Sequence, residues 1–302
     1  KDNADDIRDN IRRFEQQGLL EQIRREAKPL TRKYAAADVI FEPRALTYDE
    51  LAAEFDAVFL ALHGRPGEDG TVQRELEARG LPYNGSEPSS AAVTIHKYET
   101  LRRLAAAGFS VTGQELLPAA DFRSGPEAFL DQVVQRFRYP FIAKPVDDGC
   151  SSAVMLIRSR EQLKHYLQAL FRESEDLPVD LREALGLSYK EEFPQKAEVL
   201  LEDLITAEDA DRFLEITGGF LTRYRDGEVE YEMFEPSEAL AGGEVLSLEE
   251  KFLAGEGQNL TPARFTADPE KHEVISSQVR EVLRRAAQLL GVEGYARIDA
   301  FV

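Results

Sequence analysis

Apolar residues recur along the first third of the chain with alternating helical and strand periods. Helical spacing predicts a helix over residues 4–26, a second helix that begins at Thr47 and a third over 71–77. Short apolar runs predict strands over 38–41 and 56–62, the latter buried on both faces. Because strands that alternate with helices form parallel sheets, we expect an N-terminal α/β domain with a parallel sheet.

The remaining pattern predicts a mixed α+β region. Asp226-Gly227 between two strand candidates predicts a hairpin turn. Residues 172–196 are charged and irregular, which is typical of a surface insertion. The other expected elements, in chain order, are a helix over 94–107, a strand over 109–117, a helix over 125–137, strands over 139–144 and 154–157, a helix that ends near 171, strands over 197–201, 213–224 and 229–234, a helix over 269–290 and a strand over 294–302.

Composition describes an ordinary globular protein. The 302 residues are 43% hydrophobic and 31% charged, which suits two or three domains. The formal net charge of −19 argues against a nucleic-acid or lipid-surface partner, because polyanions would be repelled. A single cysteine excludes an internal disulfide. No apolar run approaches the roughly 18 residues of a membrane helix, so we expect a cytoplasmic protein without a membrane partner.

The segment ALHGRPGEDGTVQ, residues 61–73, is the first candidate for chemistry. It joins a predicted strand to a predicted helix, and it contains His63, several glycines and two carboxylates. Glycines at such a junction let backbone amides approach a ligand closely. Taken alone, the segment is equally compatible with a plain turn.

A second candidate begins at Lys144, which ends an apolar strand and is followed by Gly149, Cys150 and Ser151. A lysine fixed on a strand beside a hydroxyl-rich glycine loop suits nucleotide phosphates, because the cation neutralises charge while the loop amides fold over it. An exposed lysine at a strand end is the alternative interpretation.

These phrases together resemble a known family. Residues 61–86, which continue into GLPYNGS, and the KPxxxGSSxG-like loop that begins at Lys144 are similar to D-alanine–D-alanine ligases of the ATP-grasp superfamily. The resemblance implies an N-terminal substrate domain over 1–92. It also implies an ATP-grasp domain of two α+β subdomains, 93–203 and 204–302, the second of them incomplete.

The resemblance also implies a nucleotide site. Lys97, Lys144 and Lys251 would contact the phosphates of ATP, which suits a phosphoryl group whose charge spreads over several oxygens. His96, beside the first of these lysines, is expected to be a solvated helix residue rather than a ligand. The other nucleotide contacts that the resemblance implies are the loop residues Gly149, Cys150 and Ser151, the adenine hinge Glu202, Asp203, Leu204 and Ile205, and Glu215 at the ribose.

Substrate and metal residues follow from the same resemblance. His63 and Gly64 would line the first D-alanine site, and His63 would orient the substrate. Arg297 and Asp299 are two apart on a predicted strand and so face the same side. The arginine would hold the substrate carboxylate and the oxyanion, and the aspartate would bind Mg²⁺, with Mn²⁺ as an alternative metal. The residues expected to be catalytic are Arg297, His63 and Ser151.

The sequence departs from the family in two respects. Cys150 replaces the usual loop serine and Phe252 replaces the usual lid tyrosine, and the second change leaves the identity of the second substrate open. The family also has an E-x-N segment beyond the Asp299 strand that supplies further metal ligands. Since a single carboxylate is a poor magnesium site, we expect these residues to be part of a longer polypeptide.

The implied activity is the ATP-dependent joining of two D-alanines through an acyl phosphate, which is a step of peptidoglycan synthesis. Expected partners are the small molecules D-alanine and ATP, and a homodimer is left open. Two alternatives remain: a ligase that joins another carboxylate to an amine or a hydroxy acid, and a degenerate ATP-binding module of a larger protein. A Rossmann dehydrogenase or P-loop NTPase is disfavoured, because neither GxGxxG nor GxxxxGK[ST] occurs.

Overall fold

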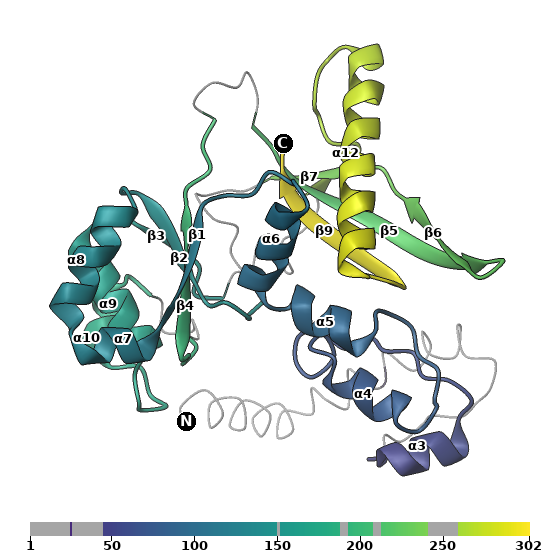
Figure 1. Cartoon of the computed structure of the whole chain (residues 1–302), viewed down its shortest axis with the longest axis horizontal. Coiled ribbons are helices and arrows are strands. Elements are labelled where there is room, and N and C mark those ends of the chain that lie inside the picture. The colour runs from purple at the N-terminus through teal and green to yellow at the C-terminus, as the bar shows by residue number, and fades with distance from the viewer. Residues whose placement is uncertain (1–24, 26–44, 150–151, 188–192, 208–212, 241–258) are drawn as a thin grey trace. The chain divides into compact units, whose positions relative to one another are not determined.

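The computed structural model of the chain describes Arg25 and residues 45–149, 152–187, 193–207, 213–240 and 259–302 (Figure 1). The chain divides into two compact units, Lys1–Thr47 with Ser188–Glu191, and Tyr48–Leu187 with Glu192–Val302. Nearly all of the first unit lies outside the described residues, including most of the predicted helix over 4–26 and the predicted strand over 38–41. The elements below belong to the second unit.

The N-terminal part of this unit contains three short helices, α3 (Tyr48–Glu54), α4 (Thr71–Glu77) and α5 (Pro88–Thr94). The predictions of α3 and α4 are confirmed, whereas α5 was not expected. Helix α4 starts after Gly70, whose φ of 82° and close approach to Pro88 both require a residue without a side chain. Val72, Leu76 and Leu81 are buried together in a small core.

The predicted strand over 56–62 is wrong for the described structure. Its one bridge is a parallel pair between Val58 and Tyr83. The side chain of Asn84 accepts a hydrogen bond from the amide of Leu60 at 2.5 Å and donates one to its carbonyl at 3.2 Å, so it occupies groups that a neighbouring strand would use. Phe59 is 72% exposed, which contradicts burial on both faces.

The middle of the chain forms a four-stranded antiparallel sheet in the order β1-β4-β2-β3. Figure 1 shows helices grouped beside this sheet. The short helices α7 and α10 were not expected, and β1 begins five residues later than predicted, at Gln114 rather than 109. The elements are α6 (Lys97–Ala106), β1 (Gln114–Pro118), α7 (Ala119–Ser124), α8 (Pro126–Arg136), β2 (Phe141–Lys144), β3 (Met155–Ile157), α9 (Arg160–Leu170), α10 (Val179–Ala184) and β4 (Glu198–Asp203).

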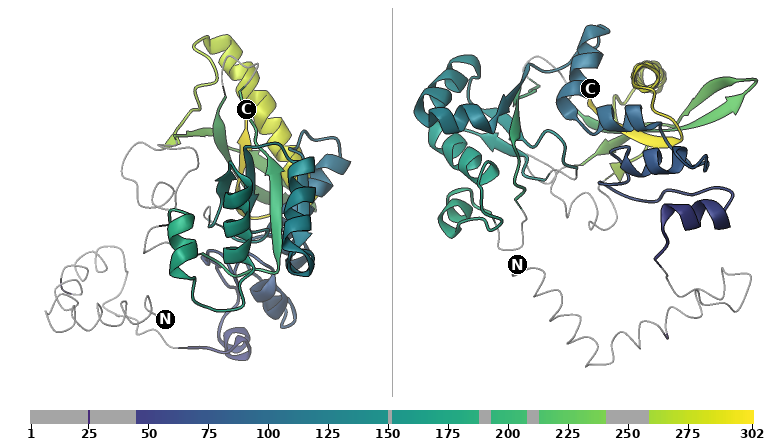
Figure 2. Two further views of the ribbon diagram at one scale, coloured as in Figure 1. Left: turned by 90° about the vertical axis from the view of Figure 1, so that its left-hand side faces the viewer. Right: turned by 60° about the horizontal axis from the view of Figure 1, so that its bottom comes forward.

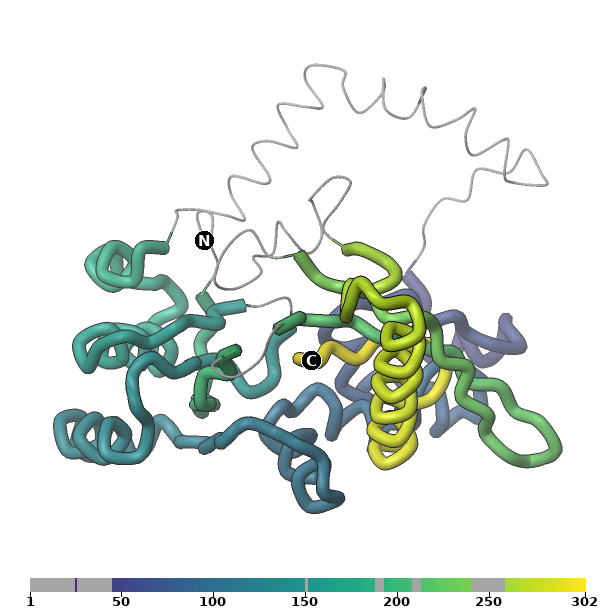
Figure 3. Tube along the Cα trace, turned by 90° about the horizontal axis from the view of Figure 1, so that it is seen from above, coloured from purple at the N-terminus to yellow at the C-terminus, as the bar shows by residue number. Residues whose placement is uncertain are grey.

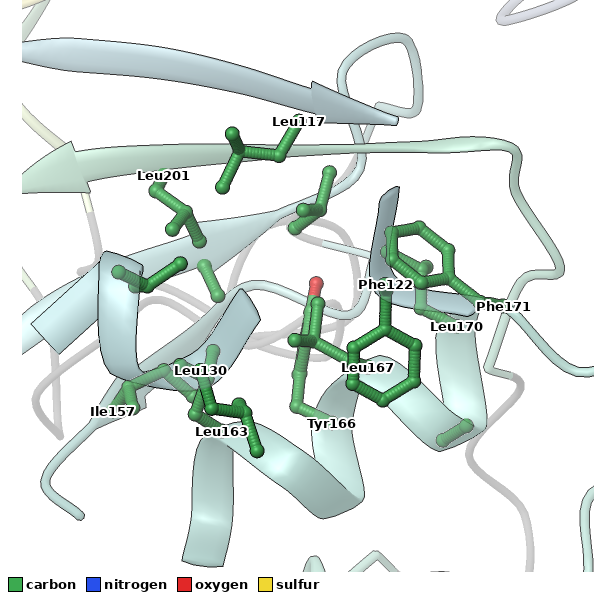
Figure 4. Packing of buried hydrophobic residues seen from close by; sticks show 14 of the residues in the cluster. Leu117, Phe122, Leu130, Ile157, Leu163, Tyr166, Leu167, Leu170, Phe171 and Leu201 are labelled. Atoms are coloured by element: carbon green, nitrogen blue, oxygen red, sulfur yellow. The ribbon is translucent and has the colours of Figure 1, made fainter. Parts of the chain in front are cut away.

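The largest core of the described chain lies between this sheet and its helices (Figure 4). Leu130 of α8 and Leu167 of α9 are fully buried there against Leu201 of β4. The hydroxyl of the fully buried Tyr166 donates to the carbonyl of Ala153 at 2.8 Å, so its polar atom is satisfied. The core therefore fixes β2 and β4, the two strands that carry Lys144 and Glu202.

The C-terminal part forms a second antiparallel sheet covered by one long helix. β5 (Glu215–Arg225) pairs with β9 (Tyr295–Phe301) on one side, and with β6 (Glu228–Met233) and β7 (Ser237–Ala239) on the other. β7 also pairs with the two-residue strand β8 (Asn259–Leu260).

The prediction of helix α12 (Pro269–Leu290) is confirmed at both ends. Its start is capped by the side chain of Asp268 and its end by Gly291 at φ 64°. Leu283 of α12 is buried with Ile216, and Ile298 packs against the same cluster. The helix therefore covers one face of the sheet, as the right-hand view of Figure 2 shows.

The predicted hairpin turn at Asp226-Gly227 is also confirmed. Both residues have positive φ, 53° and 85°, as a two-residue turn between twisted strands requires. The β5–β6 hairpin extends beyond α12 in Figure 3.

Three hydrophobic clusters fall within residues 48–83, 117–201 and 214–300. Each lies inside one of the predicted segments 1–92, 93–203 and 204–302, whose limits stay a prediction. Within the part of the chain that the structure covers, no helix is long and apolar enough to cross a membrane.

Candidate active site

The glycine turn over 61–73 is organised by Glu68. The carboxylate of Glu68 accepts a hydrogen bond from the amide of Gly64 at 2.7 Å and lies 3.6 Å from Nδ1 of His63. Gly64 itself has a φ of 69°, which lets the chain turn directly after the histidine. The imidazole is 63% exposed, so it remains accessible to a small ligand. Sequence reasoning assigned no role to Glu68, although its place inside the segment was a signal.

Lys97 lies where the sequence placed it, at the first position of α6. Its amide donates to the carbonyl of Val146 at 2.9 Å, and its ammonium donates to the carbonyl of Asp148. Burial, together with the nearby charge of Lys144, lowers the pKa of Lys97 to about 8. His96 lies at the N-cap of α6 rather than within the helix, and its ring accepts a hydrogen bond from the amide of Glu99 at 3.3 Å; that it is not a ligand stays a prediction.

Lys144 and Glu202 form an ion pair across neighbouring strands. Their side chains are 18% and 9% exposed, and the ammonium lies 2.6 Å from Oε2 of the carboxylate. Oε1 of Glu202 is buried and has no hydrogen-bond partner among the described groups. Lys97, Lys144 and Glu202 therefore share one electrostatic neighbourhood, with an acceptor left over for a further donor.

The loop after Lys144 contains two aspartates that sequence reasoning left unassigned. Asp147 pairs with Arg65 at 2.8 Å and with Lys196 at 2.9 Å, and Lys196 also pairs with Asp148 at 2.5 Å. Burial alone would raise the pKa of Asp147, but hydrogen bonds from Lys196 and Arg65 hold it below its ordinary value. The partners come from distant parts of the chain, so no local motif could have revealed them.

Arg297 and Asp299 lie on the same exposed face of β9, as predicted. Antiparallel pairing sets Thr217 of β5 opposite Asp299, and Glu215 opposite Phe301 on that same face. The hydroxyl of Thr217 is buried without a hydrogen-bond partner among the described groups. Asp299 and Glu215 lie on one face of the sheet, but no group of three or more His, Cys, Asp or Glu side chains among the described residues could hold a metal ion, so this face offers at most part of the ligand set of a hard cation such as Mg²⁺.

The remaining predicted residues are accounted for as follows. Asp203 ends β4, and its carbonyl accepts a hydrogen bond from the hydroxyl of Thr112 at 2.8 Å. Leu204 and Ile205 follow the strand, and the latter is 41% exposed. Gly149 is exposed in the loop after Lys144. The predicted residues that lie outside the described part of the chain are Cys150, Ser151, Lys251 and Phe252.

Solved structures share this fold at low sequence identity. The VanG D-Ala:D-Ser ligase from Enterococcus faecalis matches with a TM-score of 0.56 and 22% identity, over 81% of this chain and 59% of that one. The D-alanine-D-alanine ligase from Coxiella burnetii matches with a TM-score of 0.53 and 22% identity, over 82% of this chain and 55% of that one. These matches show a shared fold, in which an α/β N-terminal domain is followed by an α+β domain.

Sequence comparison gives the particular family. Residues 8–86 match the family described as D-ala D-ala ligase N-terminus, and residues 104–185 match D-ala D-ala ligase C-terminus. The D-alanine--D-alanine ligase of Leptospira interrogans is 30% identical over 247 residues, which are 82% of this chain and 60% of the relative. That of Trichlorobacter lovleyi is 29% identical over 249 residues, 82% of this chain and 64% of the relative.

The chain belongs to the D-alanine–D-alanine ligase family. It spans about three fifths of the length of the curated relatives that it matches.

Proposed function

We propose that the protein is an ATP-dependent D-alanine–D-alanine ligase. The observation that carries this proposal is that Lys97, Lys144 and Glu202 interact electrostatically with one another, next to the glycine-containing loop that follows Lys144. Two lysines from separate elements lie close enough that the charge of Lys144, after burial, helps to lower the pKa of Lys97 to about 8, and a bound phosphate would offset that repulsion. The family match is the independent support.

In this proposal the nucleotide lies along the first sheet. Lys97 and Lys144 would bind its phosphates, with Lys251 as a third cation, and the loop at Gly149, Cys150 and Ser151 would cover them. The unpartnered Oε1 of Glu202 would accept a hydrogen bond from the adenine amino group. The backbone of residues 203–205 would complete the base contacts, and Glu215 would meet the ribose.

Residues of the glycine turn and of β9 would bind the substrates. His63, held by Glu68, would orient the carboxylate of the first D-alanine, and Gly64 would offer it backbone at close range. Arg297 would stabilise the oxyanion of the tetrahedral intermediate through its forked donors. Phe252 would lie beside the substrates. Asp299 would hold Mg²⁺, which when bound neutralises phosphate charge.

The reaction that these groups would support has two steps. A carboxylate oxygen of the first D-alanine attacks the γ-phosphorus of ATP, and ADP leaves. The amine of the second D-alanine then attacks the acyl phosphate, loses a proton and expels phosphate to leave the dipeptide. Lys97 and Lys144 would stabilise the transferring phosphoryl group, and Ser151 would donate a hydrogen bond to it.

Phosphate release by the full-length protein tests the proposal. With ATP and Mg²⁺ present, we expect release to depend on D-alanine and not on L-alanine, with a dipeptide of two D-alanines identified by mass spectrometry. Replacing Arg297 by Met should lower kcat by about 10²–10³-fold. Arg225→Met, which changes an arginine 68% exposed on the neighbouring strand, is the matched control and should leave kcat unchanged. ATP binding without D-alanine-dependent turnover would instead support a binding module.

A further inference from the structure

Asp147 joins two loops that carry different parts of the proposed site. Its Oδ2 lies 2.8 Å from the guanidinium of Arg65, which belongs to the glycine turn with His63. Its Oδ1 lies 2.9 Å from the ammonium of Lys196, two residues before the start of β4. One carboxylate therefore connects the turn beside the proposed first-substrate site to the loop beside the proposed nucleotide site.

The loop that contains Asp147 is held from several other directions. The carbonyls of Val146 and Asp148 accept hydrogen bonds from the amide and the ammonium of Lys97. The carboxylate of Asp148 pairs with Lys196 at 2.5 Å. Since these bonds do not involve Arg65, the loop keeps its contacts with Lys97 of α6 and with Lys196 when the Arg65 pair is lost. Among the described residues, the Arg65–Asp147 pair thus joins the glycine turn to a loop that is also secured by Lys97 and Lys196.

The exposure of the Arg65–Asp147 pair indicates that it positions the two loops more than it stabilises the fold. The side chains of Arg65 and Asp147 are 44% and 24% exposed, and partly solvated pairs contribute little to the stability of a fold. A second contact runs from Arg65 to the carbonyl of Asp147 at 3.5 Å, so the guanidinium contacts both the side chain and the backbone of the loop. Arg65 also reaches Asp69 within its own turn at 3.3 Å.

We propose that Asp147 is a positioning residue that, through Arg65, couples occupancy of the first-substrate turn to occupancy of the nucleotide loop. The inference rests on the proposed function, because it takes the turn and the loop as the sites of D-alanine and ATP. A nucleotide bound against the loop would hold Asp147 in place and, through it, Arg65 and the glycine turn, so that the first D-alanine would bind a turn that is already arranged. By thermodynamic linkage, D-alanine must tighten nucleotide binding by the same factor.

The test measures the affinity of the full-length protein for β,γ-methylene ATP by calorimetry, with and without saturating D-alanine. We expect D-alanine to tighten binding of the analogue about tenfold in the unmodified protein. In Asp147→Asn and in Arg65→Gln this factor should fall to about twofold or less, and the double variant should be no worse than either single one. Arg65→Lys, which keeps the charge, should recover part of the factor. Arg160→Gln is the matched control, since Arg160 is 37% exposed and pairs with Asp131 away from both loops.

The outcomes separate this inference from the proposed function. If the unmodified protein does not bind the analogue, the proposed function fails and the inference fails with it. If it binds the analogue but D-alanine has no effect, or if the variants keep the full factor, the coupling role alone is refuted. A variant that loses affinity equally with and without D-alanine also refutes it, because the pair would then serve the loop's own structure.

Discussion

Lys97 gives the most quantitative prediction, because its pKa of about 8 is far below that of an exposed lysine. Burial is the larger cause and the charge of Lys144 the second. A triphosphate bound beside both lysines would add its negative charge to that of Asp148, Asp147 and Glu202, and so would outweigh the two causes that lower the pKa. Binding should therefore raise the pKa of Lys97 and draw a proton from solution.

The size of this effect depends on pH. At pH 8.5 a group with a pKa of about 8 is only about one quarter protonated, so binding that restores an ordinary lysine pKa should take up about 0.75 proton. At pH 7 the same group is already about nine tenths protonated, and the uptake should fall to about 0.1 proton. Nucleotide affinity should accordingly weaken as pH rises above 8, by at most about tenfold per pH unit.

Calorimetry in buffers of different ionisation enthalpy measures the protons directly. The full-length protein is titrated with β,γ-methylene ATP at pH 7 and at pH 8.5, and Lys97→Met supplies the background from the nucleotide itself. Lys164→Met, which removes a lysine 31% exposed on α9, is the matched control and should keep the full uptake. Equal proton uptake by the unmodified protein and Lys97→Met at pH 8.5 would refute the assignment of Lys97 to the phosphates.

Three predictions concern stability and are measured by urea unfolding. Lys144→Met leaves the carboxylate of Glu202, which is 9% exposed, without its cation and should lower the free energy of unfolding by about 3–5 kcal/mol. The double variant Lys144→Met with Glu202→Gln should recover part of this loss. Equal losses in the single and the double variant would contradict the buried pair. Leu130→Ala empties a fully buried position and should cost about 2–5 kcal/mol, and a loss below about 1 kcal/mol would contradict the packing of this core. Gly70→Ala would place a Cβ 2.5 Å from a carbonyl oxygen, whereas Gly80 has a similar φ and open space around it. Gly70→Ala should therefore lower the free energy of unfolding more than Gly80→Ala, and the reverse order would contradict the described turn.

Local sequence signals correctly predicted the elements whose ends are marked by capping or turn residues. Helix α12 follows the capping residue Asp268, begins at Pro269 and ends before Gly291, and both of its predicted limits agree with the structure. The hairpin at Asp226-Gly227 follows from turn chemistry in the same way. Such elements need no knowledge of the rest of the fold.

Predictions failed where the outcome depends on neighbours in space. The apolar run over 56–62 has strand character, but the side chain of Asn84 takes the backbone groups of Leu60 that a neighbouring strand would have paired. His96 looked like an ordinary helix residue, yet its ring accepts the capping hydrogen bond. Neither partner can be identified from spacing alone.

In the candidate site, too, the residues of local motifs were predicted and the contacts between distant segments were not. Its lysines and acids were predicted through motif order, and Lys97, Lys144 and Glu202 do lie near one another. The pairs made by Asp147 with Arg65 and Lys196 were not predicted, because tertiary contacts bring those segments together.

The central claim is that lysines from distant segments converge on one triphosphate. A crystal structure of the full-length protein with β,γ-methylene ATP and Mg²⁺ tests this claim most directly. We predict that the ammonium groups of Lys97 and Lys144 each lie within about 3 Å of phosphate oxygens, with Lys144 released from Glu202. A nucleotide bound elsewhere, or lysines that keep their present partners while the phosphates lie away from them, would contradict the account.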